Sequence, residues 1–171
     1  MARTQAASRK ANVATQNLLL WSEDLSNAAW VKTATTATAG AATDPFGTSN
    51  ASLLVPNTSN TNHQVLQSIA NLTSGNTVCF SFYAKAAGYD YLLLRVGNGM
   101  GAIINAYFNV NTGTLGTAGT SITSSITSVG SGWYLCTMFT AYSGVTSLRL
   151  NVSNADNVTN FAGDGVSGIY V

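Results

Sequence analysis

The clearest pattern in the chain is a segment at residues 76–85 in which apolar and polar side chains alternate strictly. One face of this segment carries Val78, Phe80, Phe82 and Ala84, and the residues between them lie on the other face. Side chains of a strand point to opposite faces with a period of two, so the pattern predicts a strand with one face in a core. Turn-forming residues precede and follow the segment. We interpret it as a central strand of an antiparallel sheet.

Shorter segments of the same kind recur along the chain, separated by turn signals such as Asp44-Pro45-Phe46-Gly47 and Asn111-Thr112-Gly113. Strands are predicted at 17–21, 30–39, 51–55, 63–69, 89–97, 102–110, 114–115, 121–129, 133–142, 148–152 and 168–171. One helical turn is predicted at 22–27, where Ser22 is a suitable cap and acidic residues follow it. The alternation at 63–69 is out of phase, which indicates a β-bulge. Both faces are apolar at 133–142, which is typical of a strand covered on both sides.

These short strands must each bury one face, and two packed sheets achieve this most simply. Their number and spacing are typical of an all-β fold, a two-sheet antiparallel jelly-roll sandwich. We therefore predict a jelly-roll domain at residues 17–171. It follows an extended basic N-terminal arm at residues 1–16, where the sequence has no periodicity.

Charge is scarce in this chain and unevenly placed. Only 8% of the residues are charged, compared with about 25% in typical soluble proteins. The arm contains Arg3, Arg9 and Lys10 and no acidic residue. It is either an ordinary polar terminus or a basic arm that becomes ordered on a larger partner. Three basic residues are too few to predict nucleic-acid binding.

The apolar runs are too short for an export signal or a membrane helix. Leu18–Trp21 is shorter than the roughly 7–15 apolar residues of a secretory signal. No run approaches the ~20 residues of a membrane span. The two cysteines, Cys79 and Cys136, are too few for a disulfide scaffold and are expected as free buried thiols. A bridge between them is the alternative.

No catalytic or metal-binding constellation is recognisable. His63 is the only histidine. We expect it at the surface or at a strand edge, because neither a Ser-His-Asp triad nor a zinc site can be assembled around it. The acidic residues are interpreted as turn formers rather than as a glycosidase pair. They are Glu23, Asp24, Asp44, Asp90, Asp156 and Asp164. We predict no enzyme activity and no cofactor; a structural calcium ion held by loop carboxylates and carbonyls is the alternative.

Exposed aromatic rings beside polar groups are the usual elements of a sugar-binding site. In a strand at 89–97, Tyr89 and Tyr91 share a face with Arg95, opposite an apolar face. The candidate sugar-binding residues are Tyr89, Tyr91, Arg95, Trp21 and Tyr107, with Trp30 and Tyr142 as further aromatic candidates. The alternative is that most of these rings pack in the core or in an interface.

Several stretches, in order, resemble a jelly-roll domain that is common in bacteriophage virion proteins and is similar to carbohydrate-binding modules of the family 4/9 type. The stretches are Asn17–Leu20 with Ala28–Trp30, Thr77–Lys85, Ala106–Thr114, Val129–Cys136, and Gly163–Gly165 with Ser167–Val171. Together they span about residues 17–171. The resemblance therefore covers the whole predicted domain.

This resemblance implies a structural protein of a bacteriophage virion, either a capsid decoration (cement) protein or a head-fibre protein. The implied partners are the major capsid protein or other virion proteins, contacted through Arg3, Arg9 and Lys10, and further copies in a homo-oligomer, taken to be a trimer. Nucleic acid and membrane are not expected partners. The implied location is the outer surface of the capsid, or the tail or a fibre, after assembly in the host cytoplasm. The alternative is a carbohydrate-binding adhesin module of a tail or fibre protein that binds a cell-surface glycan.

Overall fold

The computed structural model describes residues 17–69, 77–98, 103–140 and 145–171. These residues are all-β, as predicted, and form two antiparallel sheets that pack against each other. The strands are β1 (Val31–Thr33), β2 (Thr35–Ala42), β3 (Ala51–Pro56), β4 (Thr61–Ser68), β5 (Val78–Ala87), β6 (Tyr91–Asn98), β7 (Ile103–Asn109), β8 (Thr114–Ala118), β9 (Ile122–Gly130), β10 (Trp133–Thr140), β11 (Val145–Ser153), β12 (Asn160–Phe161) and β13 (Gly168–Tyr170). The predicted arm with Arg3, Arg9 and Lys10 lies outside the described residues, as does Tyr142. No helix of the described chain has the length and apolar character of a membrane span.

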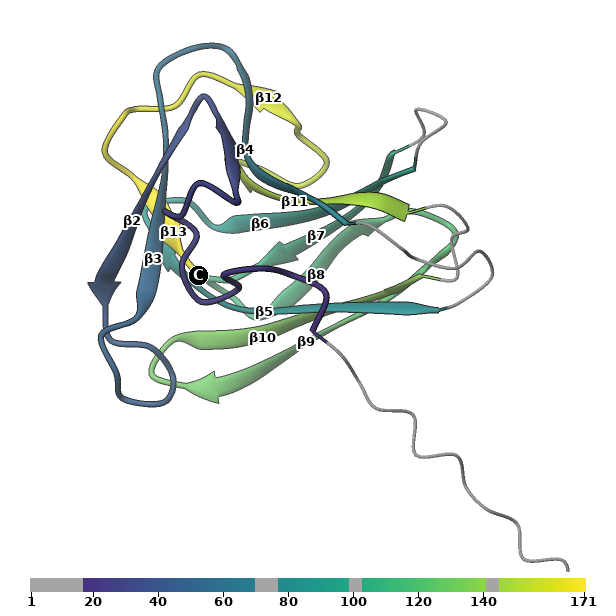
Figure 1. Cartoon of the computed structure of the whole chain (residues 1–171), viewed down its shortest axis with the longest axis horizontal. Coiled ribbons are helices and arrows are strands. Elements are labelled where there is room, and N and C mark those ends of the chain that lie inside the picture. Colours follow the sequence, from purple (N-terminus) through teal and green to yellow (C-terminus); the bar gives the residue numbers. More distant parts are fainter. Residues whose placement is uncertain (1–16, 70–76, 99–102, 141–144) are drawn as a thin grey trace, which may run out of the picture.

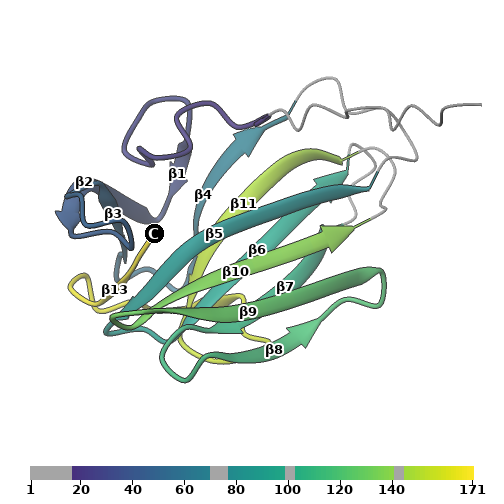
Figure 2. The same cartoon turned by 90° about the horizontal axis from the view of Figure 1, so that it is seen from below.

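The chain passes repeatedly from one sheet to the other. The first sheet has the strand order β1-β4-β11-β6-β7-β8, with β12 also paired to β4, and the second has the order β2-β3-β13-β5-β10-β9. Figure 1 shows both layers with their labels. Seen from below, β5, β10 and β9 lie in front of β11, β6 and β7 (Figure 2). This arrangement is the two-sheet sandwich predicted from the alternating pattern.

The short strand β13 joins two parts of the second sheet. It pairs with β3 on one side and with the end of β5 on the other. Gly168 permits this close approach, because a Cβ at that position would collide with the carbonyl oxygen of Leu54. The ribbon of β2 and β3 is therefore part of the same sheet as β5, β10 and β9.

The core lies between the sheets and is built from the apolar faces of the strands. Phe80 and Phe82 of β5 are buried, whereas Cys79 and Ser81 on the alternate positions are exposed. In the first sheet, Leu150 of β11 lies opposite Leu94 of β6, and both are completely buried. The predicted central strand, which is β5 in the structure, therefore has the orientation predicted for it.

The predicted strand at 17–21 and the predicted helical turn at 22–27 are wrong. This stretch forms successive turns, in which the amides of Asp24, Asn27 and Trp30 donate to carbonyls three residues earlier. The Gln67 side chain takes the place of a neighbouring strand, since its amide accepts from Leu20 N at 2.7 Å and donates to Leu20 O at 2.8 Å. The side chain of Asp24 accepts from Ser26 N, and such local bonds compete with a helix.

His63 was expected at the surface or at a strand edge, but it lies buried in β4, which has β1 and β11 on its two sides. Its ring is completely buried, because it alternates with Val65 and Gln67 on the inner face of β4. The ring nitrogens lie 2.7 Å from Ala34 O and 2.8 Å from Phe161 O. Both carbonyls are acceptors, so a neutral ring donates to one of them and only the imidazolium donates to both. The expected bulge in this segment is also absent, because β4 pairs with β11 without a break from His63 to Ser68.

The strand at 133–142 was expected to be covered on both faces. Instead, Cys136 and Met138 of β10 face the core, while Leu135 and Phe139 point outward and Phe139 is exposed. A bulge between Trp133 and Tyr134 in the pairing with β9 shifts the register at the start of the strand. The outer face of the second sheet is thus apolar in part and open to solvent.

The structure predicts that stability depends on the contact between the two inner faces. Leu150→Ala is expected to lower the free energy of unfolding by about 2–5 kcal/mol, because it leaves a cavity in a fully buried site. Leu115→Ala is the matched control, and its effect should stay within about 0.5 kcal/mol, since Leu115 is exposed. Denaturant unfolding followed by circular dichroism measures both. Equal losses in the two variants would contradict this description of the core.

Candidate functional site

The first half of β5 has a partner strand on one side only. On that side β10 pairs with β5 from Val78 to Ala84. On the other side β13 pairs only with the last three residues, Lys85–Ala87. Within the described part of the chain, the edge of β5 before Lys85 therefore has no strand beside it on the β13 side. A groove of about 770 Å³ lies along this stretch of β5.

Two loops form the walls of this groove, one from residues 17–23 and one from residues 44–51. The second loop is held by the carboxylate of Asp44, which accepts from the amides of Phe46 and Thr48 at 2.9 Å each and from the Thr48 hydroxyl. The Thr48 hydroxyl bond is the largest cause of the lowered pKa of Asp44; burial opposes it, and bonds from backbone amides lower the pKa further. The loop thus has a fixed shape that depends on an ionised Asp44.

This loop places an aromatic ring over the groove. Phe46 is 73% exposed, and its ring stands edge-on to that of Tyr83 with the centroids 5.2 Å apart. Trp133 lines the groove and is buried, at a centroid distance of 6.5 Å from Tyr170. The edge-to-face contact between Phe46 and Tyr83 orients these two rings. The groove therefore contains an exposed aromatic ring, that of Phe46, which is held in position by its contact with Tyr83.

Polar groups line the same groove. They are contributed by Asn17, Ser22, Glu23, Asn50 and Ser81. Amides, hydroxyls and a carboxylate next to a fixed ring can bind a polar, extended ligand by hydrogen bonds and stacking. Among the described residues, no group of three or more His, Cys, Asp or Glu side chains could hold a metal ion. The chemistry that this arrangement supports is binding.

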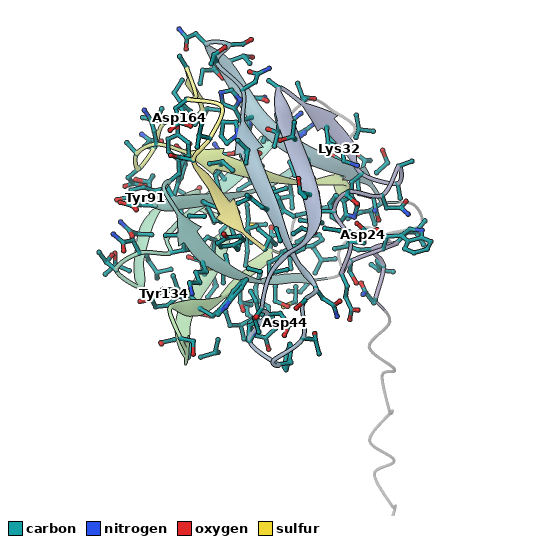
Figure 3. All side chains as sticks on the ribbon, turned by 90° about the vertical axis from the view of Figure 1, so that its left-hand side faces the viewer. Asp24, Lys32, Asp44, Tyr91, Tyr134 and Asp164 are labelled. Atoms are coloured by element: carbon teal, nitrogen blue, oxygen red, sulfur yellow. The ribbon has the colours of Figure 1, made fainter. Side chains whose placement is uncertain are left out.

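The predicted sugar-binding residues do not gather at this groove or at any other single place. Tyr91 and Arg95 share the outer face of β6, as predicted from the alternation. Arg95 is only 8% exposed, however, and Tyr107 is 1% exposed, so the ring of Tyr107 has no free face for stacking. The Tyr107 hydroxyl lies 3.2 Å from that of Thr159, in the segment that covers it. Figure 3 shows Tyr91 well apart from Asp44 in the groove wall.

The two remaining candidates lie elsewhere. Tyr89 precedes β6 and packs edge-on against Phe161, and its hydroxyl accepts from Asp164 N at 3.1 Å. Trp21 is exposed on the turn at 17–30, where its backbone has a left-handed φ of 51° and its carbonyl accepts from the indole of Trp30. Trp30 itself is buried in the core. Tyr89 and Trp21 thus lie in different parts of the sandwich.

The aromatic residues of the groove were missed at the sequence level. Phe46 lies in a predicted turn, and Tyr83 lies on the outer face of the central strand. An aromatic residue inside a turn does not belong to the buried face of a strand, so its ring can be exposed. This was the signal that could have identified Phe46 as a candidate binding residue. The position of the groove could not be predicted, because it depends on how far β13 extends along β5.

Three of the six acidic side chains act as turn formers, as predicted. Asp24, Asp44 and Asp164 each accept from a backbone amide two residues ahead. Bonds from Ser26, Thr48 and Ser167, respectively, are the main reason why their pKa values are lowered. Asp156 instead accepts from the amide and the hydroxyl of Thr117 in β8.

In comparisons with known proteins, the chain matches no protein-family model and no curated protein.

The two cysteines are free and lie on opposite faces of the second sheet. Cys79 is exposed and lines the groove, whereas Cys136 is buried in the core. Burial raises the pKa of the Cys136 thiol to about 12 and that of Cys79 by less. Because the thiolate is the reactive form, both the burial and the raised pKa of Cys136 protect it from thiol reagents in the folded protein.

The number of reactive thiols is expected to change when the protein unfolds. With Ellman's reagent at pH 8, the native protein should release about one equivalent and the unfolded protein two, because only Cys79 is accessible. Cys79→Ser should abolish the native reaction and Cys136→Ser should leave it unchanged. A native reaction that survives in Cys79→Ser would show that Cys136 is not protected by the core.

Proposed function

We propose that this chain is a non-enzymatic structural protein of a bacteriophage virion, a capsid decoration (cement) or head-fibre protein. Residues 1–16 attach it to the major capsid protein or to another virion protein, and the sandwich is displayed outward. The structural observation that supports this proposal is the groove beside the edge of β5 that has no partner strand among the described residues, since such an edge offers backbone groups to a partner protein. The resemblance of several sequence stretches to a virion jelly-roll domain supports it.

The described surface suits contacts with other proteins. An unpaired strand edge can accept an extended segment of a partner through backbone hydrogen bonds. The ammonium group of Lys32 is bonded to the carbonyls of Ser26 and Asn27, and that of Lys85 to the carbonyl of Ser131. Only 8% of the residues are charged, so we expect polar and mostly neutral contacts. Weak contacts of this kind add up when many copies are displayed on one particle.

A second function, the binding of a cell-surface glycan, is favoured by the same groove. Its exposed Phe46 ring and its amide, hydroxyl and carboxylate groups are the elements that a sugar requires. Under this second proposal the chain is an adhesin module of a tail or fibre protein. The two functions differ in the partner and in the part of the chain that binds it.

Removal of the arm tests the virion role. A chain that lacks residues 1–16 is expected to keep the far-ultraviolet circular dichroism of a β-sandwich, because the described strands begin at Val31. Its co-sedimentation with phage particles should be lost. The triple variant Arg3→Ala/Arg9→Ala/Lys10→Ala should bind at least tenfold more weakly if the charges of the arm make the contact. A folded, truncated chain that still co-sediments would contradict attachment through the arm.

Substitutions in the groove test the glycan role. On a glycan array with the protein displayed in many copies, Phe46→Ala and Tyr83→Ala are expected to weaken any binding at least tenfold, because both remove ring contacts. Phe139→Ala is the matched control, since Phe139 is an exposed aromatic residue of the same sheet outside the groove. Tyr91→Ala distinguishes glycan binding in the groove from glycan binding on the outer face of β6. Absence of binding to every glycan would leave only the structural role.

A further inference from the structure

Two arginines lie side by side on the outer face of the first sheet. Arg95 of β6 and Arg149 of β11 are direct register partners. They alternate with Leu94 and Leu150, which face the core. Side chains directly opposite each other on antiparallel strands are about 5 Å apart at Cβ, and like charges in this position repel each other. The pair therefore destabilises the folded chain unless a negative charge accompanies it.

The chain itself supplies no such charge. All six acidic side chains lie in the described residues, and none forms an ion pair with either arginine there. Arg95 is 8% exposed and donates from Nε to the amide oxygen of Asn105 at 3.1 Å. Burial lowers the pKa of Arg95 and the charge of Arg149 lowers it further, while no carboxylate raises it. This is the electrostatic environment that a bound anion would relieve.

Polar atoms without partners surround the arginine pair. Nη1 of Arg149 is buried and has no hydrogen-bond partner. Asn151, two residues further along the same face of β11, is 0% exposed, and neither its amide oxygen nor its amide nitrogen is bonded. Gln64, the register partner of Asn151 on β4, has an unbonded side-chain oxygen. Buried polar atoms are rarely left unpaired, because the loss of their bonds to water is then not compensated.

The backbone leaves room for the second guanidinium. Gly97 lies opposite Ser147, two residues from each arginine along the strands. A Cβ at Gly97 would lie 2.8 Å from Ser147 Oγ and 3.0 Å from Nη1 of Arg149. The Arg149 guanidinium thus extends over the backbone of Gly97, and its side chain remains partly exposed. A solute can reach this group from solvent.

We propose that Arg95 and Arg149 form a binding site for a single oxyanion, a phosphate, sulfate or carboxylate group. Guanidinium groups present paired N–H donors that match the oxygens of these anions. The site lies on the first sheet, so it is separate from the groove on β5 and does not depend on the proposed function. The anion binds the exposed atoms of the Arg149 guanidinium and neutralises the repulsion within the pair.

The test uses the full chain and inorganic phosphate as the probe. Phosphate is titrated at constant ionic strength, with chloride as the replaced anion, and binding is followed by calorimetry and by thermal unfolding. The wild type should bind phosphate and unfold at a higher temperature as phosphate increases. Arg149→Gln and Arg95→Gln should each bind at least tenfold more weakly. Lys85→Gln is the matched control and should bind as the wild type does, because Lys85 lies on the second sheet.

A spectroscopic measurement locates the site independently of stability. In a two-dimensional NMR spectrum, the side-chain amides of Asn105, Asn151 and Gln64 should shift with phosphate in the wild type and not in Arg149→Gln. Parallel titrations with sulfate and glucuronate identify whether a tetrahedral anion or a sugar carboxylate is preferred. Equal phosphate binding by wild type and Arg149→Gln, or no binding at constant ionic strength, would overturn the proposal. Loss of glycan binding in Phe46→Ala tests the proposed function of the groove and does not test the anion site.

Discussion

The contact between the inner faces of the two sheets is the interaction on which the rest of this molecule depends. Each strand contributes alternate side chains to it, so the positions that remain face outward in known directions. Leu94 and Leu150 fix β6 and β11, and this places Arg95 and Arg149 side by side on the other surface. Phe80 and Phe82 fix β5 in the same way and leave Ser81 and Tyr83 to the groove. The arginine pair thus lies on the reverse side of the core, whereas the groove follows the edge of β5 and is lined by residues of both faces, Phe80 and Phe82 included.

The alternating pattern was sufficient to predict the fold class and the orientation of the long strands. In β5 the buried positions follow the period of two. In β6 and β11 the core-facing leucines alternate as predicted, but outer-face residues such as Leu93 and Asn151 are completely buried as well. The prediction failed where tertiary contacts override the local pattern. Asn17–Trp21 has the composition of a strand, yet its backbone is bonded to the side chain of Gln67, which lies 47 residues from Leu20.

Long-range polar contacts explain the other differences between prediction and structure. The two carbonyls that face the ring of His63 belong to residues 29 and 98 positions away in the chain. No local pattern contains this information, and a lone histidine in a polar loop has the appearance of a surface residue. The candidate site was least predictable, because Phe46 and Tyr83 meet only through the path of the 44–51 loop. Tyr91 and Arg95 share a face as expected, but sharing a face did not make Arg95 accessible.

The position of β13 has a consequence for how the protein is made. This strand lies between β3 and β5, yet its residues follow those of all the other strands in the chain. During synthesis, the hairpin of β2 and β3 is made before β13. At that stage no strand connects the hairpin to β5 by hydrogen bonds. The second sheet closes only when Gly168–Tyr170 have left the ribosome. The sandwich therefore reaches its final form only after the segments of all the other described strands have been synthesised, and until then the second sheet is open between β3 and β5.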